Sequence, residues 1–479
     1  MKKITLSIVI LATGVFVHAQ MQNPDFEETE NNLPITWKSR PTEAYEVKSD
    51  NTVKYSGKNS LQITSTADAS GKMQTFSQLI PIPGSGLRKV RLSGYIRSEN
   101  TAGSIALWAQ VKNEEKNTID FGNSKTQNNN IIPNSDWKEY SLEFVLDDTA
   151  KNFLFGGFLS GNGKVWFDHF TVSEIPFSSK PSSEKALAYI KEFKNIVKKN
   201  SIFKNQINWT LLEKDLKKIS KGMETVEDTG PAIQYIMRTL KVSGDNHSFI
   251  DSKENVEKKA VSNTVAIEPE FKLTDQNIGY IMVPAFSSRS KEVGISFAEK
   301  IQGMIQKLDT ENTVKGWVVD LRKNTGGNMY PMITGLGPLT GEGILGYFTS
   351  DKGKHAWSYK KGTTGYGLAV SNPYSVKSPE IKIAVLIGPG TASSGEATAI
   401  SFIGKTNVKT FGQPSAGYTS GNRGFKLSDG RSLLLASSYE MDRKGKEYKE
   451  KIQPDVLVPV SENTDSDADL TAATQWILE

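Results

Sequence analysis

The stretch from Ile381 to Glu396 reads IKIAVLIGPGTASSGE and decides the fold of the C-terminal half of the chain. Its first seven residues are almost all apolar, which indicates a strand buried on both faces of a parallel sheet. A Gly-Pro-Gly turn ends the strand, and an apolar helix follows. A serine at such a junction, here Ser393, lies where unpaired backbone N–H groups and the helix dipole can hold an oxyanion. Ser393 is therefore a candidate nucleophile, although a helix cap is the commoner role for such a serine.

A second strand with a polar turn lies upstream, where Asp320 to Asn328 reads DLRKNTGGN at the end of an apolar run. Its two glycines, Gly326 and Gly327, let the backbone approach a ligand closely and expose its N–H groups. Further apolar runs at 279–283, 408–411, 424–427 and 431–437, with a helical stripe at 297–308, predict an α/β domain over residues 246–479.

The residues before this domain follow two other patterns. Short alternating runs separated by Gly, Asn, Asp and Pro clusters predict an all-β jelly-roll sandwich over residues 20–176. A Ser-rich stretch at 177–183 is typical of a linker. Apolar stripes at helical spacing over 184–245 predict a small bundle of about three helices. The fold class is thus multidomain: sandwich, helical bundle, then α/β domain.

Composition narrows the class of protein. Lys and Arg exceed Asp and Glu by only five over 479 residues, which does not indicate a nucleic-acid partner. The chain has no cysteine, which excludes disulfides and a thiol nucleophile. Residues 1–19 combine two lysines, an apolar run too short to span a bilayer, and small residues before a cleavage point. We expect a signal peptide, a secreted or periplasmic protein, and no membrane span after its removal.

The two glycine-containing segments together resemble the C-terminal processing, or tail-specific, serine peptidases and their tricorn-core relatives. Those proteins carry Asp-Leu-Arg-x-Asn-x-Gly-Gly and then Thr-Ala-Ser-x-x-Glu at a similar separation. GQPSAG at 412–417 and the Pro-Asp pair at 454–455 match later family segments, so the resemblance covers about residues 209–460. It implies a ClpP/crotonase-like fold, a polypeptide substrate, and no metal or organic cofactor.

The resemblance also assigns the groups that surround the reacting carbonyl. Ser393 becomes the nucleophile of a serine endopeptidase. The N–H of Ser394 and one from Gly326 or Gly327 form the oxyanion hole. Many members of the family use a lysine base a little over twenty positions after the serine, but residues 417–420 read GYTS.

The tricorn-like branch uses a histidine instead, and His247 stands where that branch places it. Histidine is a suitable base for a serine hydroxyl near neutral pH. The branch orients its histidine with a preceding serine, where this chain has Asn246, and with a glutamate shortly before the Pro-Asp pair. We assign the glutamate role to Glu450, with Glu447 and Asp442 as alternatives. His169 and His355 are expected to be structural.

Two further expectations concern recognition. The segment between His247 and the first strand is too short for a PDZ domain, so a substrate peptide is expected to pair with a strand edge beside Ser393. In the sandwich, NPDFE at 23–27 and VWFD at 165–168 resemble carbohydrate-binding jelly-roll modules, which makes a glycan a further candidate partner. Asp25, Glu27 and Asp168 are weak candidates for a structural calcium ion, and Trp108 and Trp166 are more typical of a core than of a sugar platform.

Two other functions stay open from the sequence. One is a non-catalytic relative that binds polypeptide or another ligand with the same fold, because fold alone does not establish activity. The other is a glycan-active enzyme, which requires two opposed carboxylates at a cleft, and no such pair is indicated here.

Overall fold

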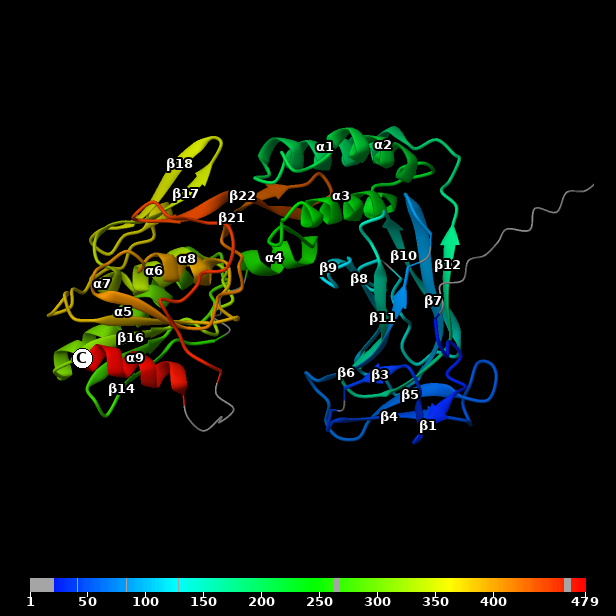
Figure 1. Cartoon of the computed structure of the whole chain (residues 1–479), viewed down its shortest axis with the longest axis horizontal. Coiled ribbons are helices and arrows are strands. Elements are labelled where there is room, and N and C mark those ends of the chain that lie inside the picture. Colours follow the sequence, from blue (N-terminus) through cyan, green and yellow to red (C-terminus); the bar gives the residue numbers. More distant parts are fainter. Residues whose placement is uncertain (1–20, 41, 83, 128, 262–266, 461–466) are drawn as a thin grey trace, which may run out of the picture. The chain divides into compact units, whose positions relative to one another are not determined.

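The computed structural model describes residues 21–40, 42–82, 84–127, 129–261, 267–460 and 467–479 (Figure 1). The expected signal peptide therefore lies outside the described residues. The chain forms two compact units. The N-terminal unit contains the chain up to Lys191 and Ile207–Gly244, and the C-terminal unit contains Glu192–Gln206 and Asp245–Glu479.

The N-terminal unit is built on two five-stranded antiparallel sheets, as the alternating runs predicted (Figure 1). The first has the order β10 (Lys138–Leu146), β7 (Arg88–Glu99), β12 (Lys164–Ile175), β5 (Ser60–Ser65), β4 (Tyr45–Asp50). The second has the order β3 (Lys38–Ser39), β6 (Met73–Pro81), β11 (Asn152–Ser160), β8 (Ser104–Lys112), β9 (Thr118–Asn123). A short hairpin of β1 (Thr29–Glu30) and β2 (Leu33–Pro34) precedes them.

Aromatic rings fill the space between the two sheets. Phe26, Phe76 and Phe167 are fully buried. The Phe76 ring contacts the other two edge to face, with its centroid 5.9 Å from that of Phe26 and 4.8 Å from that of Phe167. Gly157 makes room for this packing, because a Cβ there would lie 2.5 Å from the Phe167 ring. Trp166 is also buried, and its indole N–H donates to Asp50 at 2.8 Å, so it is a structural residue.

Three helices follow, at the places where the apolar stripes predicted them: α1 (Glu184–Asn200), α2 (Trp209–Ile219) and α3 (Gly230–Val242), the last preceded by the turn η1 (Glu227–Thr229). Pro231 occupies the first turn of α3, where its missing N–H costs nothing. The Ser-rich stretch before α1 is attached to the end of α2, since Ser182 and Ser183 donate to the carbonyls of Ser220 and Glu224.

Helix α3 packs on strands β9 and β10 of the sandwich. Its Arg238 is only 2% exposed and donates to the Val145 carbonyl and to Asp147, with Asp120 3.7 Å away. Burial raises the pKa of Asp120 to about 6, with the Arg238 charge acting in the opposite direction. The buried Arg238 and its partners thus join α3 to the sandwich within the N-terminal unit.

The C-terminal unit contains the predicted parallel sheet. Its order is β14 (Glu270–Leu273), β15 (Ile278–Met282), β16 (Gly316–Asp320), β19 (Ile383–Ile387), β20 (Val408–Gly412), β24 (Val456–Leu457), and only β14 runs antiparallel. Successive residues of β16 and β19 face opposite sides and are all buried. Val319 and Val385 pack against α5 (Lys291–Glu311), whereas Val318 and Ala384 pack against α9 (Ala468–Leu478). Helices on both faces explain why these strands read as continuous apolar runs.

A second sheet completes this unit, with the order β13 (Phe249–Asp251), β22 (Ser432–Asp442), β17 (Gly343–Ser350), β18 (Gly353–Tyr359). Strands β21 (Ser420–Lys426) and β23 (Glu447–Tyr448) also pair with β22. A turn at Asp429 and Gly430 joins β21 to β22. The remaining helical segments are α4 (Lys253–Val261), α6 (Met329–Gly335), α7 (Gly337–Thr340), η2 (Gly365–Gly367) and α8 (Ser394–Ile400).

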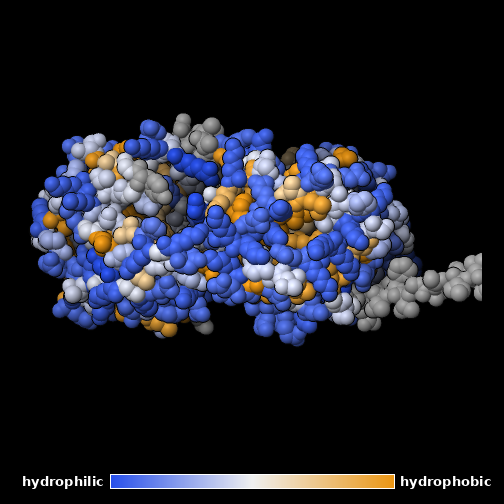
Figure 2. Space-filling model, turned by 90° about the horizontal axis from the view of Figure 1, so that it is seen from above, coloured by the Kyte–Doolittle hydropathy of each residue, from blue (hydrophilic) through white to orange (hydrophobic). Residues whose placement is uncertain are grey.

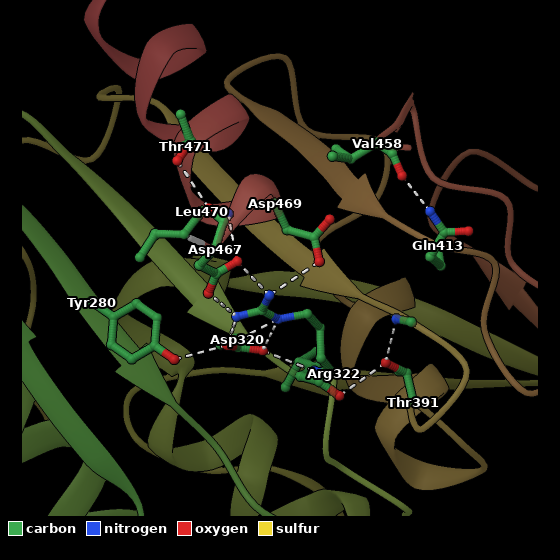
Figure 3. A network of polar contacts seen from close by, with 12 residues as sticks. Tyr280, Asp320, Arg322, Thr391, Gln413, Val458, Asp467, Asp469, Leu470 and Thr471 are labelled. Carbon is green, nitrogen blue, oxygen red and sulfur yellow. Dashed lines mark hydrogen bonds and ion pairs between the residues drawn. The ribbon is translucent and has the colours of Figure 1, made fainter. Parts of the chain in front are cut away.

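The C-terminal helix is attached to the parallel sheet through Arg322, which follows β16 (Figure 3). The guanidinium donates to Asp467 at 2.7 Å, to Asp469 at 3.0 Å and to Asp320 at 2.6 Å. Tyr280 adds a hydrogen bond to Asp320 at 2.8 Å. Asp467 is also the N-cap of α9, so one arginine ties the start of the last helix to the turn that contains Gly326 and Gly327.

No helix among the described residues has the length and apolar character needed to cross a bilayer. On the face drawn in Figure 2, hydrophilic residues predominate and hydrophobic residues form small separate patches.

Candidate active site

Ser393 lies between β19 and α8, at the N-cap of that helix, as the sequence indicated. Its backbone has φ 53° and ψ −122°, a conformation that a residue with a Cβ rarely adopts. Such strain persists only where the surroundings impose it, and it is concentrated at functional sites. Here Gly390 passes close to the Arg322 carbonyl, and the Thr391 hydroxyl donates to the Leu321 carbonyl at 2.9 Å. The turn from Gly390 to Ser393 is therefore held against the end of β16.

The double-glycine turn lies directly beside Ser393. A Cβ on Gly326 would come within 2.9 Å of the Ser393 Cβ, and the Ser394 hydroxyl donates to the Gly327 carbonyl at 2.7 Å. Both glycines have φ above 100°, which only glycine adopts without strain. The structure thus brings together all three expected oxyanion-hole residues: Gly326, Gly327 and Ser394.

The hydrogen bonds distinguish the two glycines. The N–H of Gly326 already donates to the Asn324 side chain at 3.0 Å. In the part of the chain that the structure describes, neither the Gly327 N–H nor the Ser394 N–H donates to a protein acceptor. Gly327 and Ser394 are therefore the pair whose N–H groups can bind an oxyanion, and Gly326 shapes the turn.

His247 is half-buried in the loop between α3 and β13. Its backbone N–H donates to Asp245 at 3.0 Å, and its carbonyl accepts from the Asn422 amide at 2.9 Å. Its ring Nδ1 shares a hydrogen bond of 2.9 Å with the Ser420 hydroxyl, which leaves Nε2 as the nitrogen that can accept a proton. Burial lowers the pKa of His247, although the Asp245 carboxylate opposes that shift. Burial thus favours the neutral form of the His247 ring.

Tyr418 covers the histidine ring. The two rings are nearly parallel, at 10°, with centroids 5.3 Å apart. Tyr418 stands in the GYTS segment, where many processing peptidases have their lysine. Tyr418 and Ser420 both contact the His247 ring. The GYTS segment, which has no lysine, thus contributes two neighbours of the histidine.

The structure does not bring Glu450 to His247. Glu450 is exposed, and the described contacts of this residue go through its backbone carbonyl, which accepts from Thr419. Glu447 accepts from the Thr349 hydroxyl at 2.5 Å and pairs with Lys449. Asp442 is buried but accepts the N–H groups of the turn that follows it. The Lys/Glu-rich run does not reveal which carboxylate points inward, and the described contacts of Glu450, Glu447 and Asp442 do not include the His247 ring.

A further buried carboxyl group of this region is Glu440, which was not predicted from the sequence. It is 2% exposed, lies on β22 next to the residue that pairs with Ser420, and its Oε2 has no hydrogen-bond partner among the described residues. Burial, with a further contribution from Glu396, raises its pKa well above the usual value. Ser248, which follows the histidine, donates to Asp245 at 2.6 Å. Ser420, and not Ser248, is therefore the serine whose hydroxyl contacts the His247 ring.

The other histidines and the calcium candidates have structural partners. His169 shares a hydrogen bond of 2.8 Å with Asp25, and His355 is exposed on β18. Asp168 accepts the backbone N–H groups of Tyr55 and Ser56, and Glu27 accepts those of Lys58 and Asn59. No group of three or more potential metal ligands exists among the described residues.

Comparisons with known proteins agree with this geometry. Residues 277–458 match the family described as "Peptidase family S41". The chain contains a peptidase family S41 domain. Residues 18–159 match a carbohydrate-binding domain, so the chain combines this module with the S41 domain. The N-terminal sandwich, the peptidase fold and the resemblance to processing peptidases expected from the sequence are confirmed.

Individual relatives extend this S41 assignment. The chain is 29% identical over 324 residues to the nisin-resistance protein of Lactococcus lactis subsp. lactis, covering 65% of this chain and 91% of that protein. It is 26% identical over 206 residues to the carboxy-terminal processing protease CtpA of Bacillus subtilis, covering 42% and 40%. Among solved structures, a lipoprotein from Streptococcus agalactiae shows a TM-score of 0.52 at 28% identity, covering 62% of this chain and 97% of that one.

Proposed function

We propose that this peptidase is an exported serine endopeptidase that hydrolyses peptide bonds through an acyl-enzyme on Ser393, with His247 as the general base. The observation that carries this proposal is the strained Ser393 turn, packed beside the Gly327 and Ser394 N–H groups, which have no protein acceptor among the described residues, in one compact unit with a histidine oriented by Ser420. Each part has a defined role in acyl transfer.

The reaction follows from these groups. Nε2 of His247 takes the Ser393 hydroxyl proton as the oxygen attacks the peptide carbonyl. The N–H groups of Gly327 and Ser394 stabilise the developing oxyanion. The imidazolium then gives its proton to the leaving amine, and water, activated by the same nitrogen, releases the acyl group. The hydrogen bond that Nδ1–H of His247 donates to the Ser420 hydroxyl leaves Nε2 unprotonated and directed at the reacting groups, and no metal or organic cofactor takes part.

A fluorophosphonate probe tests this mechanism directly. We expect the probe to label Ser393 of the mature protein at neutral pH, as mapped by mass spectrometry. Ser393→Ala and His247→Ala should both lose the label, and Ser394→Ala should keep it. A folded protein that remains unlabelled would favour the alternative, a non-catalytic relative that binds polypeptide. The substrate panel should include nisin, because one relative is named for resistance to it.

The sandwich supports a second function, glycan binding. A cavity of about 770 Å³ lies in the N-terminal unit, and its walls combine aromatic, amide, hydroxyl and basic groups, including Trp37, Trp108, Gln110, Ser77 and Arg40. Trp108 is half-buried, and its indole N–H is held by the Gly157 carbonyl at 3.3 Å. A fixed aromatic face beside hydrogen-bonding groups suits a sugar ring.

This second function has its own test. Trp108→Ala should weaken retention on a panel of immobilised polysaccharides, whereas Tyr55→Ala, in the loop between β4 and β5 and outside the cavity lining, should not. Equal retention of the parent protein and Trp108→Ala on every polysaccharide would contradict the proposal. Export is tested by cell fractionation and by N-terminal sequencing of the mature chain, which we expect to begin at Gln20.

A further inference from the structure

The side chain of Glu396 has an unusual set of partners. It is fully buried in the C-terminal unit, three residues after the nucleophile. Its Oε2 accepts the Ser393 N–H at 2.8 Å and the Tyr418 N–H at 2.8 Å. Its Oε1 accepts the Ser415 hydroxyl at 2.5 Å and the Gly417 N–H at 2.8 Å. One carboxylate thus satisfies four donors, which come from two segments far apart in the sequence.

One of these segments contains Ser393, and the other contains Tyr418, which contacts His247. The first donor belongs to the nucleophile itself. The other three belong to the segment from Ser415 to Tyr418, and the Tyr418 ring covers the ring of His247. A path of contacts therefore joins the proposed nucleophile to the proposed base: Ser393, the Glu396 carboxylate, Tyr418 and His247. Each step of that path is a hydrogen bond or a ring contact.

Helix capping explains only part of this arrangement. A glutamate at the third position of a helix commonly accepts the N–H of the capping residue. That role needs one contact and leaves the rest of the carboxylate in solvent. Here the carboxylate is buried, and three of its four donors lie 19 to 22 residues beyond it. Burial of a charge is tolerated only when hydrogen bonds replace its hydration, and these donors supply them.

We propose that Glu396 is a positioning residue: its carboxylate holds Tyr418, and through Tyr418 the ring of His247, in register with Ser393. The inference rests on the proposed function for its effect on activity, but the geometry it asserts can be measured without activity. The charge of Glu396 also contributes to the raised pKa of Glu440. Glutamine cannot replace Glu396, because an amide has one acceptor oxygen and would direct its NH₂ group at backbone N–H donors.

The test is the nuclear magnetic resonance of histidine ring protons in ¹³C-histidine-labelled protein, with the His247 signal assigned by His247→Gln. A stacked tyrosine shifts the protons of the ring it covers, so Tyr418→Ala defines the uncovered position and Tyr418→Phe should retain the parent position. We expect Glu396→Gln to move the His247 signal toward that of Tyr418→Ala. Labelling of Ser393 by fluorophosphonate should slow by about a hundredfold, as misplaced catalytic groups do.

Asp442→Asn is the matched control. Asp442 is also a buried carboxylate that accepts backbone N–H groups in this unit, but its donors lie in the turn at 444–446. It should leave the His247 signal unchanged. If Glu396→Gln keeps the parent signal, or if Asp442→Asn moves it equally, the proposal is wrong.

A second variant protects the test against misfolding. If Glu396→Gln does not fold, Ser415→Ala removes one donor and keeps the carboxylate, and it should move the His247 signal in the same direction by a smaller amount. An unchanged signal in Ser415→Ala would then overturn the proposal. If even the parent protein is not labelled, the proposed peptidase mechanism fails, while the resonance positions still decide whether Glu396 places the ring.

Discussion

The Ser420 hydroxyl lies 2.9 Å from Nδ1 of His247, and the two residues are 173 positions apart in the chain. Ser420 begins β21 and is 8% exposed, so strand pairing with β22 fixes its position. The segment in which many processing peptidases supply a lysine base thus supplies the hydrogen-bond partner of His247, the base that we propose for this chain.

Removal of this hydroxyl should slow catalysis without weakening substrate binding. We expect Ser420→Ala to lower kcat about five- to tenfold, because a neutral hydrogen bond contributes ~1 kcal/mol and the ring loses its fixed orientation. KM should stay within twofold of the parent value, as is usual when a group does not contact the substrate. Steady-state kinetics on a peptide substrate measure both. Ser438→Ala, a neighbouring hydroxyl on β22, should behave like the parent protein, and an unaffected kcat in Ser420→Ala would refute this role.

Substitution of Gly327 should abolish labelling of Ser393. A Cβ at this position would lie 2.0 Å from the Phe286 carbonyl, and its φ of 109° is strained for any other residue. We expect Gly327→Ala to lose the oxyanion donor geometry and to lower the free energy of unfolding by about 1–3 kcal/mol. Fluorophosphonate labelling and urea unfolding measure the two effects. Gly303→Ala, on an exposed position of α5 with open space around the new Cβ, should be labelled normally and be slightly more stable.

The pH dependence of labelling should report the environment of His247. Burial lowers the pKa of this residue below its ordinary value of 6.5, and the base must be unprotonated to act. The labelling rate should therefore rise with pH and reach half of its plateau below pH 6.5. Asp245→Asn removes the carboxylate charge that favours the imidazolium, so its half-point should move to still lower pH. A shift to higher pH in that variant would contradict this account.

Glu440 should make the C-terminal unit less stable as pH rises. Its pKa is raised well above 4.5 by burial, so the folded state holds a proton that the unfolded chain loses. Its contribution to stability is full below pH 4.5 and is lost as pH rises toward the pKa of the folded state. Glu440→Gln keeps a neutral side chain at every pH. The variant should therefore gain stability over the parent at pH 8 and show little difference at pH 4.

Hydrogen exchange of the β22 amides measures that free energy of opening at each pH. Glu447→Gln is the control, because the stability that Glu447 contributes should depend on pH in the opposite direction. Hydrogen bonds from Thr349 and Lys449 outweigh partial burial and lower the pKa of Glu447. The stability that Glu447 contributes is present above pH 4.5 and is lost on acidification, so its glutamine variant should lose stability at pH 8. A Glu440→Gln variant that responds like Glu447→Gln would disprove the buried, protonated carboxyl group.

The sequence predicted those parts of the site that local patterns determine. Ser393 and Gly327 stand at the ends of two apolar strands, and parallel strands bring such ends to one edge of a sheet. Ser420 and Glu440 depend on the pairing of β21 with β22, which no short window specifies. Alternation from Leu433 and Leu435 would place Glu440 on the opposite face of β22, and a shift in the pairing register of β21 and β22 makes Glu440 a buried position. The run at 444–451 carried more carboxylates but faces solvent.

The helical region shows the same division between local and distant information. The stripes in residues 184–245 predicted the helices, because periodicity is a local property. They could not predict that Arg238, within the α3 stripe, would be buried against Asp120 and Asp147 of the sandwich. A charged residue on an apolar helix face indicates a buried partner, but its identity depends on the tertiary structure.

The anchoring of the last helix by Arg322 has a consequence for synthesis. A chain made from its N-terminus can complete the sandwich early, but one face of the parallel sheet stays uncovered until residues 467–479 have left the ribosome. Arg322 then acquires Asp467 and Asp469, and only afterwards is the neighbouring glycine turn supported from both sides. The glycine turn beside Ser393 therefore depends on a partner segment about 145 residues further along the chain.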